Sequence, residues 1–318
     1  MKKSLLLLTL TYLLGSCAEQ KPKEPLESLQ SPPPQIEIHG HRGDRGNFPE
    51  NTIPAFISAL NKGVDALELD VVISGDNKVV VSHEPFMSHL IMTWPSGDNI
   101  SKQEEKGLNL YQMSYDSIRS YIAGVREHPQ FPQQQKGATY KPLLSELIDS
   151  VETYTRHHKL APVKYNIEIK SKRQLYNSHQ PPPEEFTKLV MNVLCDKNVL
   201  DRVYIQSFDP EVLNVMNASY PKMDLCYLVT YDDLEDNLAK LNFIPQIYSP
   251  PGKKVPDSVA AAKIKEKGME LIIWNVNDPA EMRRGMELGV MAVISDFPER
   301  ALEVKKNFSA ERQKQREP

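Results

Sequence analysis

Residues 66–84 read ALELDVVISGDNKVVVSHE, two short apolar runs rich in β-branched residues with SGDN between them. Each run predicts a strand. Because the SGDN link is too short for a parallel crossover, the two strands are expected to form an antiparallel hairpin. With a turn centred between Gly75 and Asp76, His83 would lie opposite Glu68, so the hairpin would return an imidazole to an acidic strand.

Outward from this hairpin, apolar runs alternate with helical patterns over the whole body of the chain. This alternation predicts an α/β protein with a parallel sheet, and eight strand–helix units in about 270 residues predict a TIM-like (β/α)₈ barrel. The hairpin extends the second barrel strand and adds no ninth unit. Residues 86–142 show little periodicity, so we expect a long insertion between the second and third barrel strands that covers the site and shapes specificity. The barrel strands are predicted near 35–41, 65–72, 164–170, 202–208, 224–229, 246–249, 270–276 and 292–296.

The start of the chain carries an export pattern. MKK is basic, Leu5–Leu14 is an apolar run too short to span a bilayer, and Leu14-Gly15-Ser16-Cys17 resembles the bacterial lipobox. Residues 1–16 are therefore predicted to be a lipoprotein signal peptide, with Cys17 as the lipidated membrane anchor. An ordinary secretory signal with a chance cysteine is the alternative. Ala18 stands where Asp would signal inner-membrane retention, which favours the outer membrane, facing the periplasm or the cell surface.

The remaining composition bounds the domain organisation and the partners. The charged, proline-rich residues 17–34 predict an extended tether, residues 35–305 the folded barrel, and residues 306–318 a frayed polar tail. A net charge of −4 and a pI of about 6.1 give no basic surface, so nucleic acid is not expected as a partner. Cys195 and Cys226 are either small core residues or a disulfide. The oligomeric state stays open.

Several acidic residues stand at the predicted carboxyl ends of strands, where barrels place functional groups. Glu68 and Asp70 are two residues apart and therefore share one face of their strand, and Glu168 occupies a similar place on the next. Buried carboxylates need a cation, and three of them from adjacent strands suit a hard divalent ion, Ca²⁺ or Mg²⁺. The alternative for each acid is an ion pair with a neighbouring Lys or Arg.

Histidines and fixed positive charges accompany these acids. His41 ends the first strand and His83 ends the hairpin, an arrangement typical of a general acid and a general base; His83 alone could instead be a rim histidine with structural hydrogen bonds. Arg42 and Lys170 offer cations for a phosphate. The glycines after His41 are expected to let the backbone run close to that phosphate. Together these residue types point to metal-assisted cleavage of a phosphodiester.

At this point the chain resembles a known family. The segments HGHRG…PENT, ELDV, VVVSHE, NIEIK, IQSF, WNVN and SDFP, in this order over residues 36–305, are similar to those of the glycerophosphodiester phosphodiesterase family. The resemblance implies a TIM-like barrel that hydrolyses glycerophosphodiesters to glycerol 3-phosphate and an alcohol, using a divalent cation. One departure is Glu84, which stands where the family usually has Asp after the second histidine.

The resemblance also implies a role for each matching position. It implies His41 and His83 as the catalytic pair; Glu68, Asp70 and Glu168 as metal ligands; Arg42, Lys170 and Trp274 as contacts to the phosphate and the substrate; and Glu50 and Asn51 as supporting residues, with Glu50 orienting Arg42 or His41 and Asn51 holding the loop or opening the next helix. Apart from the resemblance, the alternation of a regular strand turns His39 to the same side as His41, so His39 is expected to support the site.

Some alternatives remain open from the sequence. The nucleophile is either water or the glycerol 2-hydroxyl of the substrate, which would give a cyclic phosphate first. One rival function is a related barrel phosphodiesterase that acts on another lipid head group, of the phosphoinositide or sphingolipid type. The other rival is a surface lipoprotein whose barrel only binds.

Overall fold

The computed structural model describes residues 36–230, 232–255 and 257–315. The predicted signal peptide, Cys17 and the tether lie outside these residues and stay predictions. No helix of the described part is both long enough and apolar enough to cross a membrane.

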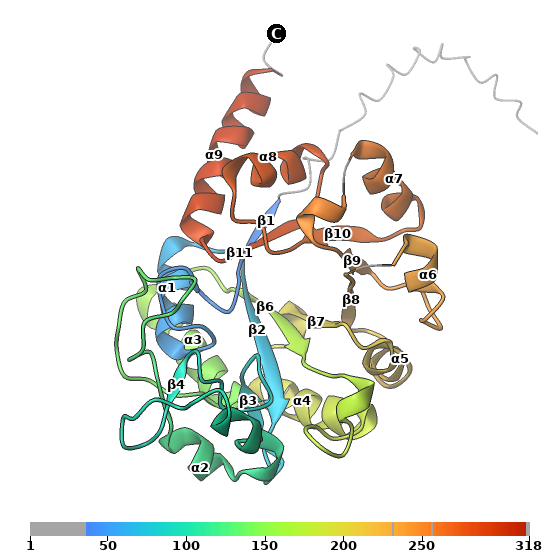
Figure 1. The fold of residues 1–318 in the computed structure, drawn as a ribbon. Helices are drawn as coiled ribbons and strands as arrows, with labels where there is room; N and C mark the ends of the chain where they lie inside the picture. Colours follow the sequence, from blue (N-terminus) through green and yellow to red (C-terminus); the bar gives the residue numbers. More distant parts are fainter. Residues whose placement is uncertain (1–35, 231, 256, 316–318) are drawn as a thin grey trace, which may run out of the picture. The chain divides into compact units, whose positions relative to one another are not determined.

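In the described part of the chain, eight parallel strands close into a barrel (Figure 1). Strand β1 pairs in parallel with both β2 and β11, which joins the two ends of the sheet. The α/β, TIM-like (β/α)₈ prediction is therefore confirmed. The barrel strands are β1 (Glu37–Gly40), β2 (Ala66–Ile73), β6 (Lys164–Ile169), β7 (Val203–Ser207), β8 (Asp224–Leu228), β9 (Ile247–Ser249), β10 (Glu270–Ile273) and β11 (Ala292–Ser295).

A helix follows each barrel strand and covers its outer face. In the first of them, α1, the buried residues Ala55, Phe56, Ala59 and Leu60 form one apolar stripe, and Gly63 ends the helix with a φ of 83°. The barrel helices are α1 (Ile53–Lys62), α3 (Leu144–His158), α4 (Pro183–Lys197), α5 (Pro210–Ser219), α6 (Leu234–Leu238), α7 (Ser258–Glu266), α8 (Pro279–Glu287) and α9 (Pro298–Lys314), with short 3₁₀ turns at Arg173–Leu175, Leu200–Arg202 and Gly252–Lys254.

The strands separate an outer apolar layer from a more polar interior. On β2, Leu67, Leu69 and Val71 belong to the core between barrel and helices, so the alternation of a strand turns Glu68 and Asp70 inward. A smaller apolar cluster fills part of the interior, and it consists of Tyr204, Cys226, Ile247, Ile272, Ala292 and Ile294. The acids therefore lie inside the barrel, next to apolar side chains.

The hairpin after β2 exists, but its register differs by one residue from the expected one. β3 (Val79–Val81) runs antiparallel to β2, and Val71 pairs with Val81. The loop has three residues, 75–77, because Asn77 adopts a φ of 59° and donates its N–H to the oxygen of Ser74. His83 is therefore not opposite Glu68. The chain leaves the ladder after Val81, and this departure carries His83 back to the mouth of the barrel.

The insertion between β2 and β6 forms a small layer of its own. It contains β4 (Met92–Thr93), β5 (Ile122–Ala123), α2 (Tyr115–Ser120) and the 3₁₀ turns Glu104–Gly107 and Leu110–Gln112. Its buried apolar residues pack with Val72 and Val80 of the hairpin and include Met87, Met92, Ile100, Leu110 and Ile118. Figure 1 shows this segment in green beside the hairpin.

The C-terminal helix is longer than the sequence suggested. α9 continues to Lys314, so residues 306–314 are helical and not a frayed tail. One buried residue, Phe308, explains the difference. The guanidinium of Arg283 on α8 lies 5.8 Å from the centre of the Phe308 ring. Arg283 also forms an ion pair with Glu311 of α9 at 2.6 Å. Cys195 and Cys226 are both free; Cys195 is exposed and Cys226 is buried.

We expect Phe308→Ala to lower the free energy of unfolding by about 3 kcal/mol, because it deletes a buried aromatic ring that holds α9 against α8. Chemical denaturation measures the change. Ser309→Ala, at the exposed neighbouring position, is the matched control and should change little. Equal stability of both variants would mean that the end of α9 does not pack.

Candidate active site

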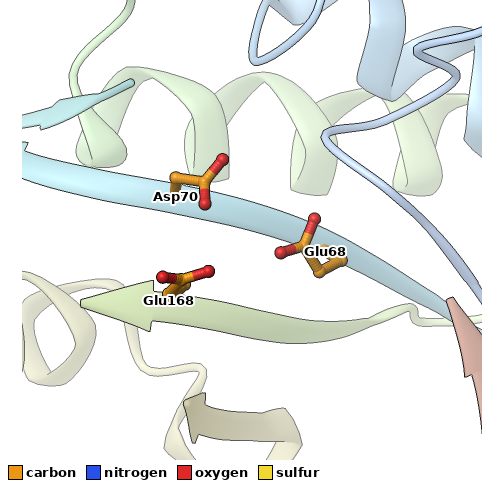
Figure 2. Close-up of side chains that lie close together, drawn as sticks. All are labelled: Glu68, Asp70 and Glu168. Carbon is orange, nitrogen blue, oxygen red and sulfur yellow. The ribbon is translucent and has the colours of Figure 1, made fainter. Parts of the chain in front are cut away.

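The three predicted acids come together where the middle of β2 lies beside the carboxyl end of β6. Figure 2 shows Glu68 and Asp70 on β2 facing Glu168 on β6. All three side chains are buried, and one carboxylate oxygen of each lies within 4.8 Å of those of the others. The register places Asp70 beside Glu168 in neighbouring strands. Carboxylate oxygens this close repel one another strongly when all are charged.

Two cationic side chains lie among the three acids. Lys170 Nζ lies 2.7 Å from Glu168 and 3.7 Å from Asp70, and Arg42 Nε lies 3.2 Å from Asp70, a contact of opposite charges without hydrogen-bond geometry. No Lys or Arg side chain of the described residues lies within 4.0 Å of Glu68. The alternative of ion pairs with Lys or Arg thus holds for Asp70 and Glu168, but it leaves Glu68 without a cationic partner among the described residues.

The electrostatics of the acids reflect this shortage of positive charge. Burial, followed by the charge of Asp70, raises the pKa of Glu68 well above its usual value. Burial also raises the pKa of Glu168, although Lys170 opposes the shift. Within the part of the chain that the structure describes, hydrogen bonds to the Glu68 carboxylate come only from the backbone N–H of Arg42 at 2.9 Å and from Gln206 Nε2 at 2.8 Å. A divalent cation among these oxygens would supply the missing charge, and an all-oxygen ligand set suits Ca²⁺ or Mg²⁺.

His41 is held by a carboxylate that the sequence reasoning left without a role. Its Nδ1 lies 2.6 Å from Asp296 Oδ1, and its Nε2 lies 3.9 Å from Glu68. The Asn275 amide nitrogen lies 2.7 Å from Nδ1 and 3.1 Å from Nε2. Burial lowers the pKa of His41, against the opposing charge of Asp296. In a neutral imidazole whose Nδ1–H donates to Asp296, Nε2 is the accepting nitrogen, and the Asn275 amide can donate to it.

His83 has a similar arrangement. Its Nδ1 lies 2.6 Å from Glu84 Oε1, and this hydrogen bond lowers the pKa of Glu84. The longer Glu84, where the family usually has Asp, thus still reaches the neighbouring imidazole. Each predicted catalytic histidine therefore has a carboxylate on Nδ1, and both imidazoles line one cavity.

A cavity of about 170 Å³ connects these groups. Its lining combines charged and polar side chains with apolar ones, and Phe208 packs edge-on against Trp274 with 5.5 Å between ring centres. Trp274 is fixed by its indole N–H, which donates to the Ser249 oxygen at 2.8 Å. The lining residues are His41, Arg42, Glu68, His83, Glu168, Lys170, Gln206, Phe208, Leu228, Trp274, Asn275 and Ile294.

Glu50 and Asn51 of the PENT segment both bond to residues of the site. Glu50 accepts hydrogen bonds from Arg42 Nη1 at 2.7 Å and from Arg45 Nε at 2.6 Å. Asn51 donates its side-chain N–H to Asp70 Oδ2 at 2.8 Å. The backbone of Asn51 is left-handed, with a φ of 56°. Asn51 therefore holds the loop against the acids, whereas Thr52 occupies the cap position of α1.

His39 faces the interior from β1, on the same face as expected, but one layer below the site. Its Nε2 lies 3.0 Å from Glu37 Oε2 and its Nδ1 lies 3.3 Å from the amide nitrogen of Asn166. Its ring stacks on Tyr204 with 6.0 Å between centres. The described contacts of His39 thus belong to a polar floor of the barrel, in which Lys164 also binds Glu37 at 2.5 Å.

The insertion does not line the cavity, contrary to the expected cover. Its residues instead hold the loop that carries Arg42: Gln133 and Gln134 donate side-chain N–H groups to the oxygens of Gly46 and Arg45, at 2.7 and 2.6 Å. His128 Nε2 also lies 3.9 Å from Glu50. The insertion thus contacts the site through this loop and the hairpin.

Packing explains the glycines of this loop better than the expected approach to a phosphate. Gly43 has a φ of 89°, and a Cβ there would lie 2.7 Å from the backbone of Ala55. A Cβ on Gly46 would lie 2.3 Å from the ring of Phe297. Both glycines are required by neighbouring protein atoms, and neither lines the cavity.

Asp296 and Gln206 belong to the quoted segments SDFP and IQSF, and the sequence assigned neither residue a role. Asp296 directly follows β11, so its position had the same signal as the acids of β2. Gln206 lies beside Glu168 in the register of β6 and β7. The sequence could nominate both side chains, but only the closed barrel brings Asp296 to a histidine 255 positions away.

Comparisons with known proteins agree with this geometry. The model of the glycerophosphoryl diester phosphodiesterase family matches residues 41–300. A glycerophosphodiester phosphodiesterase of Bacillus altitudinis is 28% identical over 275 residues, which are 86% of this chain and 99% of the relative. A crystal structure from Silicibacter pomeroyi, described as a candidate enzyme of this type, has a TM-score of 0.77 at 26% identity and covers 89% of this chain and 97% of its own. An Oleispira antarctica phosphodiesterase, solved with the product sn-glycerol-3-phosphate, shares the fold with a TM-score of 0.66 at 22% identity, over 86% of this chain and 97% of its own.

Glu68→Gln tests the crowding of the acids. Because the pKa of Glu68 is raised, folded metal-free protein keeps a proton that the unfolded chain releases near pH 4.3, so stability falls as pH rises above that value. We expect the variant to match the wild type below about pH 4 and to melt at a higher temperature at pH 7. Gln206, whose Oε1 has no partner, can turn to accept from the new amide.

Added Ca²⁺ or Mg²⁺ should raise the melting temperature of the wild type much more than that of Glu68→Gln. Thermal melts with and without the ion measure both effects. Glu287→Gln, at an exposed position on α8, is the control and should respond to the ion as the wild type does. A lower melting temperature of metal-free Glu68→Gln at pH 7, or an unchanged ion response, would contradict the prediction.

Proposed function

This chain belongs to the glycerophosphoryl diester phosphodiesterase family, and we propose that it hydrolyses glycerophosphodiesters to glycerol 3-phosphate and an alcohol with one bound divalent cation. It is a phosphoric diester hydrolase, as the family match over residues 41–300 and the similar enzymes indicate. One observation carries the proposal: two carboxylate-backed histidines line one small cavity together with Glu68 and Glu168, two of the three crowded carboxylates.

The proposed metal ligands are Glu68, Asp70 and Glu168. Their oxygens are close enough to bind one ion, and the raised pKa of Glu68 indicates that the site lacks positive charge. When bound, such an ion neutralises the negative charge that develops on the phosphoryl oxygens. Arg42 and Lys170 line the same cavity and would bind the phosphate from the protein side.

The two histidines are proposed to move the protons. His41, which burial keeps neutral, would take the proton of the nucleophile at Nε2, and Asp296 would stabilise the imidazolium that forms. His83 would then give a proton to the leaving alcohol, oriented by Glu84. Both imidazoles line the cavity, as an acid–base pair on one phosphorus requires.

The cavity size supports a small diester as the substrate. Its volume of about 170 Å³ is well below the roughly 300–1,000 Å³ typical of sites for drug-sized ligands. Trp274 and Phe208 form an apolar wall against which the glycerol or the alcohol would lie. The related Oleispira antarctica enzyme was solved with sn-glycerol-3-phosphate, a molecule of the expected product class.

We also propose that the protein is an exported lipoprotein, anchored to the outer membrane by a lipid on Cys17. The support is the sequence pattern alone: a basic start, the apolar run Leu5–Leu14 and the cysteine that follows Gly15 and Ser16. The tether 17–34 would then hold the barrel near the membrane, within reach of diesters released from lipids.

Purified protein should release glycerol 3-phosphate from glycerophosphocholine, glycerophosphoethanolamine or glycerophosphoinositol when Ca²⁺, Mg²⁺, Mn²⁺ or Co²⁺ is supplied, and not after chelation. His41→Ala and His83→Ala should each lower kcat by about 10³-fold with little change in melting temperature, because each removes a proton-transfer group. An assay coupled to glycerol 3-phosphate dehydrogenase measures turnover.

His157→Ala, an exposed histidine on α3, is the matched control and should keep full activity. Turnover of intact phosphoinositides or sphingolipids, without turnover of any glycerophosphodiester, would favour the head-group rival. Absence of hydrolysis for every diester and ion would favour a binding protein. Substantial activity in either catalytic variant would remove that histidine from the mechanism.

Cells that express the wild type should carry the protein in the membrane fraction with a fatty-acid label, whereas Cys17→Ser should be unlabelled and soluble after export. Fractionation with palmitate labelling measures both. Labelling of the Cys17→Ser variant would overturn the assignment of the anchor.

A further inference from the structure

Lys141, at the end of the insertion, is a buried cation outside the cavity. Its Nζ donates a hydrogen bond to Ser82 Oγ at 2.7 Å, and only 4% of the residue is exposed. Among the described residues, no carboxylate lies within 4.0 Å of Nζ. Burial lowers the pKa of Lys141 to about 8, although Glu50, Glu84 and Asp70 act in the opposite direction. The amine is therefore still mostly protonated at neutral pH, and burying it without a paired carboxylate costs stability.

The hydrogen bond from Lys141 ends at the residue before His83. Ser82 is fully buried, its Oγ donates to the oxygen of Glu84 at 2.7 Å, and its N–H donates to the oxygen of Asp70 at 2.9 Å. The Ser82 hydroxyl thus accepts a hydrogen bond from Lys141 and donates one to the backbone oxygen of Glu84, two residues further along the chain. A chain of two successive hydrogen bonds connects Lys141 through Ser82 to the backbone of Glu84, the residue after His83.

This chain matters because the strand no longer supports His83. β3 ends at Val81, so the ladder with β2 does not fix the backbone of residues 82–84 beyond the one bond to Asp70. The imidazole points into the cavity, and its Nδ1 is held by Glu84, whose own backbone oxygen Ser82 holds. Orientation of the ring therefore depends on Ser82, and Ser82 depends on Lys141.

We propose that Lys141 is a positioning residue for His83, which it fixes through Ser82 so that Nε2 faces the scissile phosphate. The inference rests on the proposed function for its effect on turnover. A lysine that only filled space would be better replaced by an apolar side chain of similar length, since the amine must be desolvated. A buried charge kept at a cost in stability next to a reactive histidine is typical of a functional role.

The experiment compares Lys141→Met, Ser82→Ala and the double variant with the wild type. We expect each single variant to lower kcat by about tenfold or more, since a small misplacement of a catalytic group has effects of this order. KM should stay within about threefold, because the phosphate-binding side chains are untouched. Lys141→Met should melt no lower than the wild type. The double variant should be no slower than the slower single variant, as expected for residues that act through one another.

Two further measurements keep the outcome clear. Lys136→Met, at an exposed lysine of the same insertion, is the matched control and should keep full kcat. In metal-free protein, the ring resonances of His83 should shift in Lys141→Met and Ser82→Ala, while those of His41 should not. This spectroscopic readout needs no turnover, so it still tests the positioning if the proposed function fails.

Unchanged kcat and unchanged His83 resonances in Lys141→Met would overturn the proposal. So would a rise in KM alone, or additive losses in the double variant, since Lys141 would then act by another route. If Lys141→Met does not fold, Ser82→Ala decides: a lowered kcat with normal KM supports the proposal, and an unchanged kcat overturns it.

Discussion

Glu68, Asp70 and Glu168 point into the barrel from β2 and β6, and their mutual repulsion is the constraint on which the rest of the site depends. Buried carboxylates this close are tolerated only with compensating charge. Arg42 and Lys170 supply part of it, and Glu50 in turn fixes Arg42. The loop after β1, the segment PENT and the end of β6 are thus all arranged around the same excess of negative charge.

Much of this arrangement could be predicted because its causes are local. The period of two in a strand places Glu68 and Asp70 on one face, and the alternation of strands and helices gives the (β/α)₈ barrel. The positions of His41, Arg42 and Lys170 then follow from where their strands end. Each of these features depends on a single segment of the chain, so the sequence of that segment is enough to predict it.

Other features could not be predicted because they depend on contacts between distant segments or on small conformational choices. The hairpin register turns on whether Asn77 takes a left-handed conformation, and SGDN is compatible with a two-residue or a three-residue loop. The length of α9 depends on one buried ring, Phe308, within a polar stretch. The bond between His41 and Asp296 needs the barrel to close, and His39 could be placed on the right face but not in the right layer.

The insertion contacts the segments next to both histidines of the proposed acid–base pair without contributing to the cavity wall. Its glutamines hold the loop that follows His41, and its last segment holds the turn that contains His83. Relatives of this barrel with different insertions would thus differ in how firmly the two histidines are held, even where every cavity residue is the same. A directed-evolution library that varies only the cavity wall would therefore not sample changes in rate that come from contacts between the insertion and the segments next to the histidines.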